Sequence, residues 1–321
     1  MSQASDWDAA LAAFASPPPL LQSWAWGEVQ SRAGWAVERV RLDGAMASVL
    51  TRGLGPLREA YVPRGPVPAT PASVASLLDW ARERRLARLR IEPEAPPQLG
   101  EGLKSLGFAV TTPIQPQHSV VVRLRAPDEM LKGFRHGRRY NIRAGLRRGA
   151  LVEEGRDAAE LARQSAAVER RASIDLPERG YYQLLLELLP WCRTFVARHP
   201  ESGDALAAVL VARHAGRGYS LFAGRSGDHP ELMGNDLAWW AALTACAQAG
   251  DSDFDLWGTP PPGAAPDHPW RGLGLFKSEF NGEEVAYAGA WEVELSRGGS
   301  KLLGLGRSTR PAIRRLRRNI S

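Results

Sequence analysis

Apolar residues along the chain follow two spacings, one typical of helices and one typical of strands. The clearest helical stretch is 70–85, where Thr70 is the predicted N-cap and Pro71 takes the first helical position. Its apolar side chains recur on one side of the helix, at Val74, Leu77, Leu78 and Ala81. The same spacing predicts further helices over 6–14, 22–32, 100–106, 130–148, 157–171, 181–189 and 235–250.

Strand-like alternation is clearest at 37–42 and 46–51, on either side of Asp43-Gly44. An Asp-Gly pair between two alternating runs is a strong hairpin signal. Similar runs predict strands over 87–91, 119–124, 193–197, 204–214, 218–224, 254–257 and 285–294.

The predicted elements repeat in order: a helix pair, a strand hairpin, a helix and a strand occur on each side of about residue 125. A length of 321 residues also fits two domains. We therefore predict an α/β (α+β) fold with two similar domains, 1–125 and 126–289, each a mixed sheet flanked by helices. We expect the last segment, 290–321, to return to the first domain.

The composition, with 44% hydrophobic and 24% charged residues, is typical of a globular protein with an ample core. No apolar run approaches the roughly 20 residues that span a bilayer, and the acidic N-terminus is unlike a signal peptide. Two cysteines, Cys192 and Cys246, lie in apolar surroundings without metal-ligand spacing. From these features we expect a cytoplasmic protein with reduced cysteines.

The charge is positive, with a formal net charge of +6, and it is concentrated. Residues 131–148 include seven Lys or Arg and no acid, and 307–318 form a second basic run. Such clusters favour phosphate backbones or anionic lipid headgroups. A solvated helix face explains either cluster equally well by itself, whereas two clusters together favour an anionic partner.

The motifs of several enzyme classes are missing. Gly-Leu-Gly segments beginning at Gly53, Gly272 and Gly304 lack the third glycine of a dinucleotide fold, and we interpret them as turns. The sequence has no GxxxxGK[ST] phosphate loop, no GxSxG motif, and no glycine-rich loop suited to the pyrophosphate of acyl-CoA. Its six histidines are scattered, so we expect neither a metal nor a cofactor.

A lone lysine, Lys277, lies between glycines and aromatic residues in the stretch 268–282. In apolar surroundings its charge would act strongly on its neighbours and stabilise a developing negative charge. The alternative is that its stem packs on Phe276 while the ammonium reaches solvent. Spacing alone favours this second interpretation.

Other candidate residues lie where predicted strands end or helices begin. Asp255 ends a strand, where α/β sheets commonly place functional groups, although it can equally cap the next turn. Tyr61 and Arg64 occupy the corresponding place in the first half. Arg179 and Tyr182 lie where a helix begins and suit phosphate or sugar, although such tyrosines are as often core residues.

Seven short motifs follow one another from residue 21 to about 291. They are Leu21-Gln-Ser-Trp-Ala-Trp-Gly27, Tyr61-Val-Pro-Arg-Gly-Pro-Val67, Gln115-Pro with Ser119, Arg139-Tyr-Asn-Ile-Arg143, Asn235 with Leu237 and Trp239, Phe254-Asp-Leu-Trp-Gly258, and His268-Pro through Gly272-Leu-Gly-Leu-Phe-Lys277 to Phe280-Asn-Gly282. In this order they resemble the Fem family of non-ribosomal peptidyl transferases, which use aminoacyl-tRNA to build the cross-bridge of peptidoglycan.

The resemblance implies two acetyltransferase-like (GNAT-type) domains, with the reaction beside Phe276 and Lys277. Lys277 would stabilise the tetrahedral oxyanion, and Phe276 would be its positioning neighbour. No histidine or carboxylate is clearly placed to take the proton of the acceptor amine: Asp255 is a weak candidate base, and assistance by the substrate is equally possible. Asn281 departs from the family, because it replaces the first glycine of the usual FGG.

The resemblance also suggests binding residues. We expect substrate contacts from Tyr61, Arg64, Arg179, Tyr182, Phe222 and Arg32. Of these, Phe222 replaces a tyrosine common in the family, and Arg32 lies near Gln30, which replaces a common lysine. We expect the basic stretch to bind tRNA through Arg135, Arg138, Arg139 and Arg143.

The resemblance therefore predicts an aminoacyltransferase that moves glycine, alanine or serine from aminoacyl-tRNA to the side-chain amine of a peptidoglycan stem peptide. The precursor would be lipid II or UDP-MurNAc-pentapeptide, and peripheral contact with the inner face of the cytoplasmic membrane is compatible with this activity. One alternative is a GNAT-like N-acyltransferase with an acyl-CoA or carrier-bound donor. Another is a non-catalytic protein that binds RNA or a membrane surface.

Overall fold

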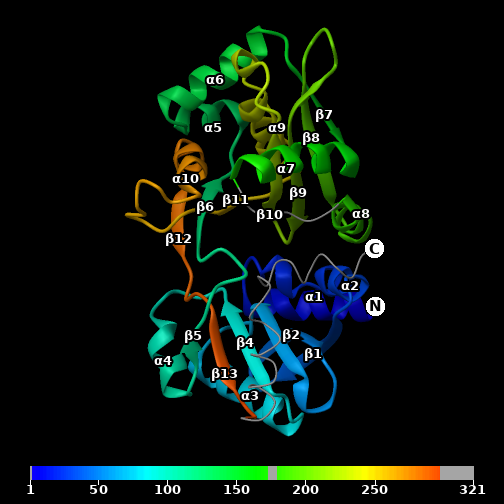
Figure 1. Ribbon diagram of the computed structural model, residues 1–321, viewed down its shortest axis with the longest axis vertical. Coiled ribbons are helices and arrows are strands. Elements are labelled where there is room, and N and C mark those ends of the chain that lie inside the picture. The colour runs from blue at the N-terminus through cyan, green and yellow to red at the C-terminus, as the bar shows by residue number, and fades with distance from the viewer. Residues whose placement is uncertain (1, 173–178, 297–321) are drawn as a thin grey trace. The chain divides into compact units, whose positions relative to one another are not determined.

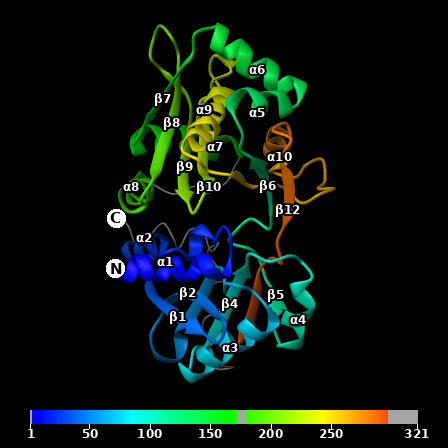
Figure 2. The same cartoon turned by 180° about the vertical axis from the view of Figure 1, so that it is seen from behind.

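The computed structural model describes residues 2–172 and 179–296, which form two compact units (Figures 1 and 2). The first comprises the chain up to Gln117 together with the segment that begins at Ala286, and the second is His118–Val285. Each unit has its own mixed sheet with helices packed against it. The predicted α/β (α+β) fold with two helix-flanked mixed sheets is thus confirmed.

The first unit has a six-stranded sheet in the order β1-β2-β3-β4-β13-β5, in which β3 and β4 run parallel. Its strands are β1 (Ala36–Leu42), β2 (Ala45–Arg52), β3 (Glu59–Arg64), β4 (Arg88–Pro93), β5 (Ala109–Val110) and β13 (Trp291–Glu294). Its helices are α1 (Gln3–Phe14), α2 (Trp24–Arg32), α3 (Pro71–Glu83) and α4 (Leu99–Ser105), with 3-10 turns η1 (Leu20–Gln22) and η2 (Gly55–Leu57). The hairpin predicted across Asp43-Gly44 is β1–β2, with Leu42 paired to Ala45.

Helix α3 begins where its sequence predicts. Thr70 and Ser73 form a capping box, in which each side chain accepts a hydrogen bond from the backbone of the other. The predicted apolar side of α3 joins the core of this unit, with Val74, Leu77, Leu78 and Ala81 all buried. Local capping and hydrophobic spacing therefore suffice to define this helix.

The second unit has a seven-stranded sheet in the order β12-β6-β11-β10-β9-β8-β7. Its strands are β6 (His118–Arg123), β7 (Leu151–Gly155), β8 (Cys192–Arg198), β9 (Ala205–His214), β10 (Arg217–Arg225), β11 (Asp253–Gly258) and β12 (Glu283–Ala286). Its helices are α5 (Pro127–Gly133), α6 (His136–Arg147), α7 (Ala158–Ala172), α8 (Arg179–Leu188), α9 (Gly234–Gln248) and α10 (Arg271–Ser278), with the 3-10 turn η3 (Pro230–Leu232). Leu237, Trp239 and Leu243 of α9 belong to the core cluster that covers β9 and β11.

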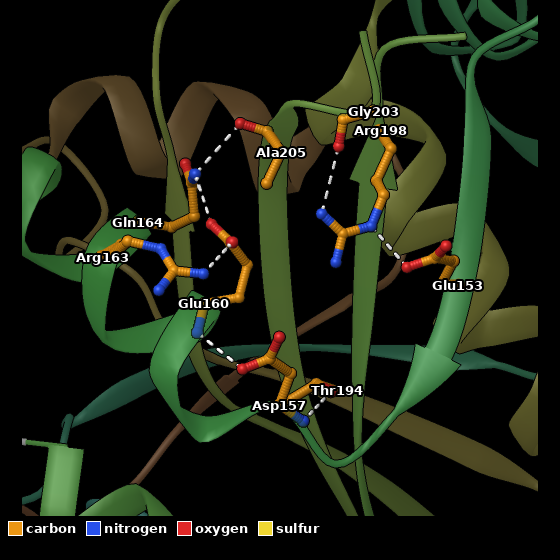
Figure 3. A network of polar contacts seen from close by, with 9 residues as sticks. All are labelled: Glu153, Asp157, Glu160, Arg163, Gln164, Thr194, Arg198, Gly203 and Ala205. Atoms are coloured by element: carbon orange, nitrogen blue, oxygen red, sulfur yellow. Dashed lines mark hydrogen bonds and ion pairs between the residues drawn. The ribbon is translucent and has the colours of Figure 1, made fainter.

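Polar contacts fix α7 against β8 and β9 (Figure 3). The carboxylate of Asp157 accepts from Glu160 N at 2.8 Å and so caps the first turn, while Asp157 N donates to Thr194 Oγ1 at 3.0 Å. Gln164 Nε2 donates at 3.0 Å both to Glu160 Oε1 and to the carbonyl of Ala205. Because these bonds reach two strands, they define where α7 crosses the sheet.

The basic stretch 130–148 is not the single helix that its sequence predicts. It forms α5 and α6, because Phe134 and Arg135 adopt extended backbone between them. Phe134 is 1% exposed and belongs to the core, and Gly133 before it has weak helix propensity. Burial of the aromatic ring therefore interrupts the helix.

The predicted strand 285–294 is also divided. Its two ends are β12 and β13, which belong to different sheets. Gly289 lies between them with a φ of 85°, a conformation that interrupts a strand and favours glycine.

The two cysteines are buried and free. Within 2–172 and 179–296, no helix is both long and apolar enough to cross a bilayer. The second basic run, 307–318, lies outside the described residues.

Candidate active site

The candidate site of the second unit begins where two parallel strands part. Strands β10 and β11 pair from Arg217–Asp253 to Tyr219–Asp255 and no further, although both strands continue. The pairing of β10 with β9 is irregular between Ser220 and Phe222, and that of β11 with β6 is irregular after Asp255. Beyond Tyr219 and Asp255 the two strands therefore no longer bond to each other, which leaves backbone groups for other partners.

A strained turn follows at the end of β11. Trp257 has a φ of 62°, in the left-handed region that non-glycine residues rarely adopt. The carboxylate of Asp255 accepts from Trp257 N at 2.7 Å and from the hydroxyl of Ser119. Asp255 thus stabilises the turn, as one of its two sequence interpretations predicts.

This turn holds Lys277, in the last turn of α10. Lys277 Nζ donates to the carbonyl of Trp257 at 3.1 Å and to that of Gly258 at 2.8 Å. Its side chain is 4% exposed, and Nζ lies 5.7 Å from the centroid of the Trp239 ring. In the described part of the chain, no carboxylate forms an ion pair with it.

Burial lowers the pKa of Lys277 to about 7, against the smaller opposing effect of the Asp255 charge. The nitrogen is therefore poised to change its protonation state near neutral pH. The interpretation in which this ammonium reaches solvent is wrong, because it is the nitrogen itself that is enclosed.

Phe276 is half-buried and packs edge-on against Trp239, with ring centroids 5.6 Å apart. It belongs to an aromatic group with Phe280 and Phe134. A firmly packed Phe276 agrees with a positioning role beside Lys277, which stays a prediction. The same holds for Asp255 as a base.

The predicted phosphate-binding residues of α8 differ in exposure. Arg179 is exposed at the first position of the helix. Tyr182, by contrast, is completely buried, with its ring 5.0 Å from that of Phe222. Direct contact of Tyr182 with a substrate is therefore a wrong prediction: Tyr182, Leu185 and Leu186 form the buried side of this helix. Phe222 is half-buried, and its ring packs edge-on against that of Tyr182.

The four arginines expected to bind tRNA also differ. Arg135 and Arg143 are exposed, whereas Arg139 is half-buried and donates to the carbonyl of Phe134. Arg138 is 1% exposed and forms an ion pair with Asp236, so direct tRNA contact by Arg138 is a wrong prediction. Its buried position follows from the helical period, which turns it toward α9 together with Ile142 and Gly145.

The first unit encloses two of its predicted site residues. Tyr61 is 6% exposed and accepts from Gln115 Nε2 at 3.2 Å, and burial raises its pKa well above the usual value. Arg64 is 5% exposed and donates to the carbonyl of Pro116 at 2.7 Å, with its guanidinium 4.0 Å from the Tyr287 ring centroid. Contact of Tyr61 and Arg64 with a substrate, which the resemblance implies, stays a prediction. Arg32 is exposed in the last turn of α2.

Sequence reasoning missed Glu92, which is 2% exposed in β4 of the first unit. Its carboxylate accepts from Ile114 N at 2.8 Å and from Gln115 N at 2.5 Å, and burial is the main cause that raises its pKa. A signal did exist: Glu92 in β4 corresponds to Asp255 in β11, since each acid lies in the second strand of a parallel pair.

The residues that the structure describes include no group of three His, Cys, Asp or Glu arranged to hold a metal ion. The arrangement around Lys277 instead offers one buried amine, held by carbonyls, next to aromatic rings. Such a group stabilises negative charge when protonated and accepts a proton when neutral.

Comparison with known proteins defines the class of the second unit. Residues 132–269 match the family described as "Acetyltransferase (GNAT) domain". This segment includes β10, β11 and the turn that holds Lys277, but ends before Lys277 itself.

Solved structures share the fold of the whole chain. The crystal structure of FemX superposes with a TM-score of 0.78 at 19% identity, covering 95% of this chain and 98% of FemX. L-PGS from Bacillus licheniformis gives a TM-score of 0.56 at 15% identity, covering 88% and 92%. A tandem GNAT protein from the clavulanic acid biosynthesis pathway gives 0.53 at 14%, covering 89% and 92%. No curated protein matches the sequence.

These matches confirm two GNAT-like domains and support the resemblance to the Fem family at the level of the fold.

Proposed function

We propose that this protein is a Fem-like aminoacyltransferase, which moves an amino acid from aminoacyl-tRNA to the side-chain amine of a peptidoglycan stem peptide. The observation that supports it best is the position of Lys277: its buried amine is held where the parallel strands β10 and β11 of a GNAT-like unit stop pairing. The order of motifs around Lys277 resembles the Fem family, and the fold of the chain is that of FemX.

In the proposed reaction, the acceptor amine attacks the carbonyl carbon of the aminoacyl ester. The carbon–nitrogen bond of the new amide forms and the bond to the ribose oxygen breaks. The amine loses one proton and the ribose oxygen gains one. Because the aminoacyl ester is already activated, no nucleotide is consumed. Two substrates held side by side supply much of the acceleration, and the Lys277 ammonium stabilises the oxyanion between the two steps.

We assign the proposed partners to exposed residues of the second unit. Arg135 and Arg143 on the exposed side of α6 are proposed to contact the tRNA backbone. Arg179 is proposed to contact the precursor phosphates beside Phe222. The lipid-linked precursor, lipid II, would bring the protein to the inner face of the membrane, whereas a nucleotide-linked precursor would leave it in the cytoplasm.

A second candidate, acyl transfer from acyl-CoA, is favoured by the GNAT family match at 132–269. The segment between β10 and α9, where a strand leads into a helix, counts against it. The N-terminus of a helix attracts a pyrophosphate, but here the segment before it is acidic, with Asp228 and Glu231. These carboxylates disfavour a second group of negative charges.

One assay separates the two donors. Purified protein is given UDP-MurNAc-pentapeptide or lipid II in vesicles, with tRNA charged with glycine, alanine or serine, or with acetyl-CoA. We expect mass spectrometry to find one added aminoacyl residue with a charged tRNA and no acetyl group. Acetylation without aminoacyl transfer would replace the proposal by its second candidate.

A further inference from the structure

The last turn of α10 contains a carbonyl that the helix itself does not satisfy. In a continuing helix, the N–H of Phe280 would bond to the carbonyl of Phe276. Here Phe280 N donates instead to the carbonyl of Lys277 at 3.2 Å. Buried carbonyls at helix ends need an outside donor, and Arg138 Nη2 supplies one to Phe276 at 2.8 Å.

Arg138 is enclosed by groups that leave it few other positions. Its guanidinium carbon lies 3.9 Å from the Phe276 ring centroid and 4.5 Å from that of Phe280. Its charge is balanced by Asp236 in the first turn of α9 and by Glu279, 3.3 Å away, directly after α10. A planar guanidinium can bond in its plane while it packs against aromatic rings, which an ammonium cannot do in the same way.

The start of α6, on which Arg138 lies, is itself fixed to the end of α10. Arg135 N donates to the carbonyl of Glu279 at 2.9 Å. A Cβ at Gly137 would lie 3.2 Å from the Glu279 carboxylate, so glycine permits this close approach. Asn141, one turn further along α6, donates to the same Asp236 oxygen as Arg138, at 3.1 Å. One guanidinium thus joins α6, α9 and the end of α10.

We infer that Arg138 is a positioning residue for Lys277. It fixes the peptide bond between Phe276 and Lys277 and packs against the rings of Phe276 and Phe280, and so directs the lysine to the carbonyls of Trp257 and Gly258. The inference rests on the proposed function for its effect on catalysis. Arg138 lies in α6, the helix proposed to contact tRNA, and yet it affects catalysis from within the core.

The test uses Arg138→Met, Arg138→Lys and a matched control, Arg213→Met. Arg213 has the same kind of partners elsewhere in this unit: it pairs with Asp251 at 2.5 Å and donates at 2.8 Å to the carbonyl of Ala249, the C-cap of α9. The control therefore removes an equivalent Arg–Asp pair and helix-end bond from a helix without Lys277. Thermal unfolding is measured for all three variants.

Two readouts are made. In the transfer assay we expect Arg138→Met to lower kcat by about 100-fold, with KM for both substrates within about two-fold, because misplacement of a catalytic group by about 1 Å costs that much. Arg138→Lys should recover only part of the loss. In the absence of substrates, reductive methylation of Lys277 followed by mass spectrometry against pH should show a midpoint near 7 in the wild type. In Arg138→Met the midpoint should move upward by at least about one pH unit as the lysine leaves its enclosure.

The inference is overturned if the Lys277 methylation midpoint stays the same in Arg138→Met, or if Arg213→Met lowers kcat equally. Because methylation needs neither tRNA nor precursor, a wild-type protein without transfer activity would refute the proposed function and leave this readout in force. Should Arg138→Met fail to fold, the methylation midpoint of Arg138→Lys decides in its place.

Discussion

The two units use the same strand arrangement in different ways. In the first, β3 and β4 pair over their whole length, from Glu59–Arg88 to Arg64–Pro93, and the acid near the end, Glu92, is bonded to backbone N–H groups. In the second, β10 and β11 stop pairing at Asp255, and the freed backbone carbonyls hold Lys277. Early loss of a few ladder bonds thus leaves backbone carbonyls that hold a buried amine.

The buried charges of the two units also differ in sign. The first encloses a carboxylate of raised pKa and the second an amine of lowered pKa. Burial disfavours the charged form in both cases. For Glu92, hydrogen bonds from the backbone of Ile114 and Gln115 offset part of that cost, followed by the charges of Arg90 and Arg64. For Lys277, the charge of Asp255 is the opposing effect. Of these two buried groups, Lys277 is the one whose pKa, about 7, lies near neutral pH.

The largest expected effect comes from Lys277→Met. Loss of the oxyanion donor should lower kcat for aminoacyl transfer by about 10²–10³-fold, with precursor binding largely intact. The measurement is single-turnover transfer together with calorimetric binding of the precursor. Lys104→Met, an exposed lysine of the first unit, is the matched control. Near-normal turnover in Lys277→Met would exclude Lys277 as the catalytic residue.

Lys277 should also make stability depend on pH. Its pKa is lowered from 10.5 to about 7 in the folded protein, so between these values the unfolded chain binds more protons and the free energy of unfolding rises with pH. Each pH unit in this range contributes up to about 1.4 kcal/mol. Urea unfolding at pH 7 and pH 9 should show this rise in the wild type and lose it in Lys277→Met. An identical pH dependence in both proteins would mean that the lysine is solvated.

Glu92 should give the opposite slope at lower pH. Because burial raises its pKa, the folded protein binds more protons just above the ordinary value of 4.5, and stability falls as the pH rises through that range. Glu92→Gln should remove this slope and cost about 1–3 kcal/mol, since an amide nitrogen cannot accept from the backbone N–H groups. Urea unfolding from pH 4 to 7 measures both effects, with Glu83→Gln as the exposed control. We expect kcat to stay within about three-fold, as a large fall would give the first unit a direct part in catalysis.

The smallest effect is expected on the surface of α6. Reversal of Arg135 and Arg143 to Glu should weaken tRNA binding and flatten its salt dependence, because each lost phosphate contact lowers the slope by about one. Filter binding from 50 to 200 mM salt measures this, with Arg41 and Arg82 reversed in the first unit as the control. Equal loss in both double variants would reflect net charge alone, and unchanged binding would place tRNA on another surface.

Local sequence determined much of this protein. The capping of α3, the hairpin at Asp43-Gly44 and the order of helices and strands depend on neighbours within a few residues, so they could be predicted. The ordered motifs also indicated the right fold and singled out Lys277. Short-range patterns carry this information because helical and strand periods are properties of the local backbone.

Only the tertiary structure decided what surrounds each candidate residue. Arg138 and Arg143 belong to one basic stretch, yet one is enclosed against Asp236 and the other is exposed. Tyr182 was a binding residue by resemblance and is a core residue in fact. Even the enclosure of Lys277 depends on carbonyls of Trp257 and Gly258, some 20 residues earlier in the chain. Burial and pKa depend on contacts between segments that are distant in the chain, and the local periodicity of the sequence carries no information on these contacts.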